Sequence, residues 1–68
     1  MTKKEFIESM DLIESLAYSI NEYNDDMVLD PEINLSEEDH DLLNEIWLFA
    51  DNIIGDAIKL RRRVMERK

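Results

Sequence analysis

The sequence contains no cysteine, one glycine and one proline. Without cysteine the chain cannot form disulfides or thiolate metal sites, which stabilise many domains of this size. Since glycine and proline are so rare, few positions interrupt a helix. A chain of 68 residues is also close to the size below which a single-chain core becomes marginal. Oligomerisation is therefore the expected means of burying further apolar surface.

Basic residues are missing from the middle of the chain, and none occurs between Glu5 and Ile58. That interval holds 16 of the 17 acidic residues, and the formal net charge of the whole chain is −9. Such a body repels nucleic acids, nucleotides and anionic lipids, and it attracts basic surfaces over long distances. It also disfavours enzymes of phosphate or carboxylate substrates, because their sites need arginine or lysine.

Long hydrophobic runs are missing as well. An amphipathic pattern begins soon after Met1, and no apolar run has the length of a signal peptide or of a membrane-spanning helix. We therefore expect a cytoplasmic protein.

The first half of the chain has the periodicity of a helix over about residues 3–27. Thr2 and Glu5 have the spacing of a capping box, which satisfies free amides of a first helical turn. A core-facing seam then steps by three and four residues through Phe6, Met10, Ile13, Ala17, Ile20, Asn24 and Met27. Pro31 disfavours helical geometry in Asp30, so the helix is expected to end before these residues.

A second helix is predicted over about residues 36–67, after a connection at about 28–35. Ser36 is a good cap, and Glu37, Glu38 and Asp39 follow it in the first turn, where the helix dipole favours negative charge. The core-facing seam of this helix is Leu43, Ile46, Ala50, Ile53, Ala57, Leu60 and Val64. Pairing of the two seams predicts an all-α fold, in which residues 1–68 form one domain, an antiparallel two-helix hairpin.

The second helix carries more apolar surface than one partner helix covers. Four consecutive large apolar residues, at positions 46–49, point in four directions because each residue turns the helix by about 100°. We expect a stripe beside the seam to stay exposed on the hairpin and, together with Ile46, to form an oligomer interface. The residues of this stripe are Leu42, Trp47, Phe49, Ile54, Ile58 and Met65. Two hairpins would cover it as a homodimeric four-helix bundle.

Acidic residues gather at the predicted connection and at the helix ends beside it. We call this group the acidic tip; it consists of Asp25, Asp26, Asp30, Glu32, Glu37, Glu38, Asp39 and Asp41. One interpretation is a solvated helix junction. Another is a set of carboxylates that imitates the phosphates of a duplex and occupies a basic groove on another protein. A third is calcium binding, although the glycine and the terminal glutamate of an EF-hand loop are missing.

No arrangement of side chains in the sequence indicates an enzyme. His40 is the only histidine, and the chain has no cysteine nucleophile, glycine-rich phosphate loop or HExxH motif. Glu37 and His40 have the spacing seen in carboxylate-bridged di-iron proteins, and a dimer would present two such pairs with Glu22. We predict no catalytic residue, cofactor or metal, and a carboxylate and histidine metalloprotein is kept as an alternative.

Two features of the second helix have two interpretations each. The basic residues of positions 59–68 either complement the helix dipole and pair with Glu5 and Glu8, or form a nucleic-acid-binding patch. The first interpretation needs fewer assumptions. Gly55 either permits a close helix approach or a bend, or is simply tolerated in mid-helix.

Together these patterns predict a small non-enzymatic interaction protein. It is expected to be an inhibitor or regulator that binds the basic surface of a nucleic-acid-handling protein, without binding nucleic acid or membranes directly. Phage and bacterial inhibitors often have this size, charge and helical form, which is an analogy only. The alternative is a structural or adaptor module that only mediates helical assembly. Salt distinguishes the two, because only the inhibitor should lose affinity steeply as ionic strength rises.

Overall fold

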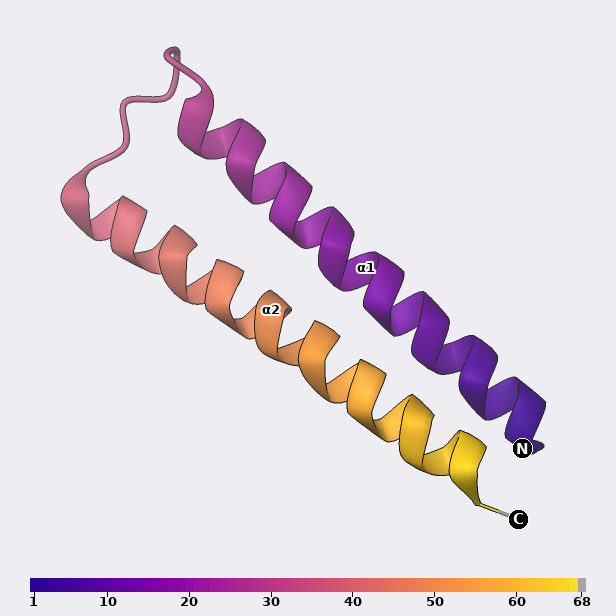
Figure 1. Cartoon of the computed structure of the whole chain (residues 1–68). Helices are drawn as coiled ribbons and strands as arrows, with labels where there is room; N and C mark the ends of the chain where they lie inside the picture. Colours follow the sequence, from indigo (N-terminus) through magenta and orange to yellow (C-terminus); the bar gives the residue numbers. More distant parts are fainter. Residues whose placement is uncertain (68) are drawn as a thin grey trace.

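Two helices lie side by side and antiparallel in the computed structural model, which describes residues 1–67 (Figure 1). Helix α1 spans Lys3–Leu29 and helix α2 spans Glu37–Glu66. Both chain ends lie at one end of the hairpin, and the connection lies at the other (Figure 1). The predicted all-α helical hairpin is therefore confirmed.

Both helices begin with the capping residues that the sequence predicts. The Thr2 hydroxyl accepts a hydrogen bond from the Glu5 amide at 3.1 Å, and the Glu5 carboxylate accepts one from the Thr2 amide. At the start of α2, the Ser36 hydroxyl accepts a hydrogen bond from the Asp39 amide at 3.2 Å. The Asp39 carboxylate accepts one from the Ser36 amide at 2.9 Å. These bonds satisfy amides that have no partner within a first helical turn. At its other end, α1 extends two residues beyond the predicted 27, up to the residue before the proline-containing turn.

The helices face each other through positions that differ from half of the predicted seam. The most buried line of α1 consists of Met10, Glu14, Ala17, Asn21 and Asn24, and that of α2 consists of Leu43, Ala50, Ile54, Ala57, Arg61 and Val64. Phe6 is half-buried as predicted, and beyond it every second position of the predicted seam is covered, namely Met10, Ala17, Asn24, Leu43, Ala50, Ala57 and Val64. The predicted positions between these do not lie on the most buried line. Each helix is rotated about its axis so that the next residue in the sequence faces the other helix instead.

This rotation exchanges apolar side chains for polar ones between the helices. Glu14 and Arg61 enter the seam and pair with each other, in positions that the pattern gave to residues such as Ile13 and Leu60. Six apolar residues of the predicted seam are consequently only half-covered, with exposed fractions of 39% to 45%. These residues are Ile13, Ile20, Met27, Ile46, Ile53 and Leu60.

Ile54 is the clearest correction to the predicted exposed stripe. Its exposed fraction is 8%, and it belongs to a buried cluster with Ala17 and Ala50, against which Ile58 packs. The expectation that the hairpin leaves Ile54 uncovered was therefore wrong. The core consists mainly of alanine, and no large side chain among residues 1–67 is fully buried.

Gly55 does not mark a close approach of the helices. A Cβ atom added there would have no other atom within 4 Å, apart from the neighbouring residues and backbone of its own helix. Its backbone is ordinary helix, with no positive φ. The interpretation of close approach is therefore wrong, and a glycine in mid-helix costs about 1 kcal/mol relative to alanine.

Candidate functional site

The acidic tip exists as a spatial group at the connection end of the hairpin. The last turns of α1, the connection and the first turns of α2 lie together at this end (Figure 1). They carry the eight carboxylates, all of them exposed. The structure thus brings together the acids that the sequence grouped there.

Two carboxylates of the acidic tip shape the local backbone. Asp30 accepts a hydrogen bond from the Glu32 amide at 2.9 Å, which stabilises the turn that follows α1. The Asp39 carboxylate accepts a hydrogen bond from the Ser36 amide. Hydrogen bonds with the backbone and side chain of Ser36 lower the pKa of Asp39 below its ordinary value. The chain therefore already uses these two acids to hold its own backbone.

The other six carboxylates of the acidic tip have no such use. Within residues 1–67 their side chains form no ion pair and no hydrogen bond to another residue; they are Asp25, Asp26, Glu32, Glu37, Glu38 and Asp41. Six unscreened negative charges at one end of a small protein produce a field that attracts cations and basic surfaces.

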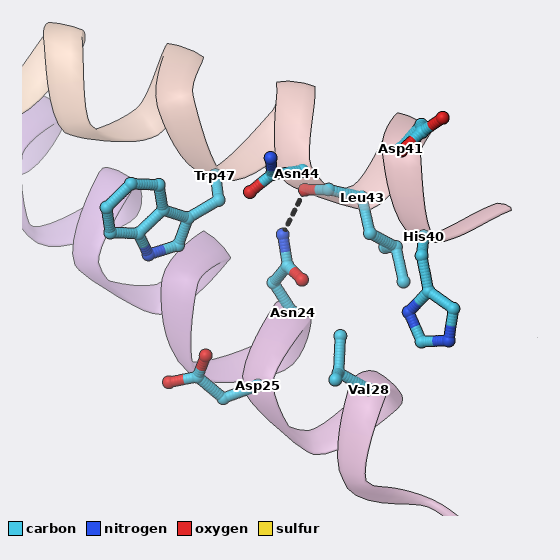
Figure 2. Close-up of a pocket in the computed structure, with 8 residues that line it drawn as sticks. All are labelled: Asn24, Asp25, Val28, His40, Asp41, Leu43, Asn44 and Trp47. Atoms are coloured by element: carbon cyan, nitrogen blue, oxygen red, sulfur yellow. Dashed lines mark hydrogen bonds between the residues drawn. The ribbon is translucent and has the colours of Figure 1, made fainter. Parts of the chain in front are cut away.

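A hollow of about 480 Å³ lies between the helices beside the tip (Figure 2). Asn24, only 4% exposed, reaches across it from α1 and donates a hydrogen bond to the Leu43 carbonyl at 2.7 Å. The Trp47 ring forms one wall, and carboxylates of Asp25 and Asp41 lie among the lining residues. An aromatic face beside carboxylates suits a guanidinium or ammonium group, because cation–π attraction adds to charge attraction.

A second hollow, of about 690 Å³, is mostly apolar. Side chains of both helices and of the connection line it: Tyr23, Met27, Ile33, Leu35, Leu42 and Leu43. Asp26, Asp30 and Asp39 also contribute to its lining. Only Leu43 is shared with the hollow that contains Trp47, which indicates that the two hollows lie on opposite sides of the seam. Sequence periodicity did not reveal this hollow, since the connection contributes to it.

The pair proposed for a metal site is split between two settings. His40 lies in the hollow beside Trp47, whereas Glu37 is exposed in the first turn of α2. Across the described chain, no three histidine, aspartate or glutamate side chains are close enough together to hold a metal ion.

At the end with the chain termini, basic side chains bind other parts of the chain. Arg61 donates to Asp11 at 2.5 Å and to Glu14 at 2.7 Å, and these bonds raise the pKa of Arg61 above its ordinary value. Lys3 donates to the carbonyls of Met65 and Arg67 at 3.1 and 2.7 Å, where the last turn of α2 leaves acceptors free. A basic side chain therefore does complement this helix end, but among the described residues it is Lys3 of α1, and not one of the basic residues of positions 59–67, that donates to these carbonyls.

The partners of the basic end were predicted incorrectly. We expected Glu5 and Glu8 to pair with the basic residues of α2, but the ion pairs between described residues join Arg61 to Asp11 and Glu14. Placing the two helices antiparallel with Glu14 opposite Arg61 would have identified the pair. The hydrophobic pattern hid it, because it assigned the adjacent Ile13 and Leu60 to the seam.

Comparison of the chain with protein-family models, with curated proteins and with solved structures gives no match. Neither α1 nor α2 is long and apolar enough to cross a membrane in the part of the chain that the structure describes. The function must therefore be inferred from the charge and geometry of the hairpin.

Proposed function

We propose that this protein is a non-enzymatic inhibitor or regulator, of the type used by phages and bacteria, that acts in the cytoplasm as a homodimeric four-helix bundle. It binds the basic surface of a nucleic-acid-handling protein and thereby competes with DNA. The observation that carries the proposal is the group of six carboxylates at the acidic tip that have no ionic partner among residues 1–67.

The shape of the hairpin supports competition with a duplex. The rod measures 52 × 16 × 15 Å, so its length corresponds to about 15 base pairs at about 3.4 Å each. A groove that accepts duplex phosphates has the positive potential to receive the acidic tip of such a rod. Long-range attraction would bring the acidic tip to such a groove, which raises the association rate.

The hollow beside Trp47 supports a second, short-range step. Once the acidic tip approaches a basic surface, an arginine or lysine side chain enters the hollow between the indole ring and the Asp25 carboxylate. Desolvated aromatic contacts slow dissociation more than exposed charges do. The acidic tip thus sets the encounter, and the hollow sets the lifetime of the complex.

Charge reversal at the acidic tip tests this proposal. The variant Asp25→Lys, Asp41→Lys, Glu37→Lys and Glu38→Lys should lose at least about tenfold in affinity for basic DNA-binding proteins, because both steering and contact charges are reversed. Immobilised protein is exposed to host extract, retained proteins are identified, and their release by salt and by competing duplex DNA is measured. The far-UV circular dichroism spectrum of the variant should show the same helix content as that of the wild-type protein.

A matched control reverses four acids outside the acidic tip, namely Glu8, Glu22, Glu45 and Asp56, all exposed. Both variants change the net charge by the same amount, so only the location differs. Retention should survive in the control. Equal loss of retention in both variants would show that net charge alone governs binding. Retention that is unchanged by salt and by competing duplex DNA would favour the adaptor alternative.

The adaptor alternative has an observation of its own in favour, namely the half-covered apolar residues beside the seam. In that case the apolar surface is the functional surface, and the carboxylates serve solubility.

A further inference from the structure

The six half-covered apolar residues lie on one face of the hairpin. Ile13, Ile20 and Met27 each follow a seam position of α1 by three residues, and Ile46, Ile53 and Leu60 do the same on α2. Three residues turn a helix by about 300°, so these side chains flank the seam on a constant side of each helix. Because the helices are antiparallel, the same offset on both helices points to the same side of the hairpin. We call this continuous surface the apolar face.

Further side chains extend the apolar face. By the same helical geometry Phe49 and Leu42 of the predicted interface fall on it, and both are more than half exposed. The hollow lined by Tyr23, Met27 and Leu42 lies at its tip end and shows that α1 and α2 contribute to one surface.

The opposite face is mixed. Trp47 shares its hollow with Asp25, His40 and Asn44, and Ile58 and Met65 share another with Arg61, Arg62 and Glu66. These three apolar residues of the predicted stripe therefore lie among polar and charged groups. On the apolar face, by contrast, apolar side chains recur on both helices, from Ile13 to Met27 on α1 and from Leu42 to Leu60 on α2, with Asp56 and Arg63 at its edge.

The hairpin exposes more surface than a compact protein of its mass. Its accessible area is 5711 Å², whereas a compact chain of 8.1 kDa exposes about 4,500 Å². The difference of about 1,200 Å² exceeds the roughly 800 Å² that each partner buries in a standard dimer interface. One hairpin therefore has enough spare surface for a stable contact with one copy of itself.

Charge decides how two copies meet. A twofold axis that brings two apolar faces together places the connections either at the same end or at opposite ends. The first arrangement puts acidic tip beside acidic tip and basic end beside basic end. The second puts each acidic tip beside the basic end of the other copy, where Lys3, Lys4, Arg62 and Arg63 lie. Like charges repel and opposite charges attract, so the second arrangement is favoured.

We propose that a second copy of this chain covers the apolar face in head-to-tail orientation, with the connections at opposite ends of a four-helix bundle. This inference rests on the dimer of the proposed function and specifies its face and orientation. It also divides the acidic tip. Asp26, Asp30 and Asp39 line the hollow of the apolar face and approach the basic end of the second copy, whereas Asp25 and Asp41 line the hollow beside Trp47 and stay available to another protein.

A single spin label tests the orientation. The chain has no cysteine, so the variant Asn34→Cys, at an exposed position of the connection, carries one label per chain. Pulsed dipolar spectroscopy of the pure protein should give a separation close to the 52 Å length of the rod. A separation below about half of that length would place the connections together and overturn the proposal, and so would a monomer in sedimentation at the same concentration.

A pair of substitutions tests the face. Ile53→Asp charges the centre of the apolar face, and Leu48→Asp makes the same change about 140° around α2, at a comparably exposed side chain. Ile53→Asp should raise the dimer dissociation constant at least about a hundredfold, while Leu48→Asp should keep a mass of two chains. Equal dissociation in both variants, or none in Ile53→Asp, would overturn the proposal.

The label decides the orientation even if Ile53→Asp fails to fold, because Asn34→Cys leaves the helices unchanged. Both measurements are made without another protein. A failed dimer therefore leaves the charge-reversal test of the inhibitor proposal intact, and failure of the inhibitor proposal leaves the spin-label distance intact.

Discussion

The two ends of the hairpin use charge differently. At the end with the termini, Arg61 holds Asp11 and Glu14, and Lys3 holds the last carbonyls of α2. At the connection end, six carboxylates extend into water without an ionic partner among the described residues. Arg61 and Lys3 thus use their charges to join the helices, whereas these six carboxylates do not. A stable hairpin would not need this separation, since acids and bases mixed along the rod would stabilise it better.

The contacts between the helices also change along the hairpin. Near the middle of the hairpin, Ala17, Ala50 and Ile54 form the buried cluster, and Ala57 is buried one turn further toward the termini. Toward the connection, a single hydrogen bond from Asn24 to the Leu43 carbonyl crosses the helices, with a hollow on each side. Apolar packing joins the helices around the buried cluster, whereas the Asn24 hydrogen bond aligns them near the connection.

The largest expected effect comes from charging the packed half. Ile54→Asp places a carboxylate inside the buried cluster, which should lower the free energy of unfolding by about 3–5 kcal/mol and abolish the hairpin. Far-UV circular dichroism and urea unfolding measure the loss. Ile53→Asp, one residue earlier on the apolar face, should keep most of its helix. If the two variants were equally helical, the observed rotation of α2 would be wrong.

A smaller effect is expected from removing the polar bond of the other half. Asn24→Leu keeps a side chain of similar size but loses the hydrogen bond to the Leu43 carbonyl, so stability should fall by about 1 kcal/mol. Hydrogen exchange measured by NMR should speed up more in amides near the connection than in those near Ile54. Uniform acceleration along both helices would show that the two halves are not separately held.

The smallest effect is expected at the ion pairs of the basic end. Glu14→Gln should lower the midpoint of thermal unfolding more than Asp11→Asn does, because the Glu14 side chain is 16% exposed and that of Asp11 is 56% exposed. In the wild-type protein, added salt should first weaken the contribution of the Arg61–Asp11 ion pair to thermal stability, since exposed pairs are screened more strongly. Identical shifts for both variants would indicate that Arg61 does not discriminate between its two partners.

Local signals predicted the helices and their ends well. The Thr2 and Ser36 capping boxes and the Asp30-Pro31 stop depend on residues within a few positions of each other, so they are readable from the sequence. The antiparallel hairpin follows from two such helices and a short connection. The position of the acidic tip follows in turn, because its residues flank that connection.

The rotation of the helices was not predictable from hydrophobicity alone. Ile13 and Glu14 both fit the spacing of three and four residues, and an apolar pattern selects Ile13. The choice of Glu14 depends on Arg61, which lies 47 residues away in the sequence and opposite it in space. The same long-range dependence hid the burial of Ile54 and the continuity of the apolar face.

The bond between Lys3 and the Arg67 carbonyl also has a practical consequence. It holds the beginning of α1 against the end of α2, so that a purification tag or fused reporter attached at either terminus emerges from the same pole of the rod. The connection of the same hairpin lies at the opposite pole, so a tag at either terminus is far from the connection of its own chain (Figure 1).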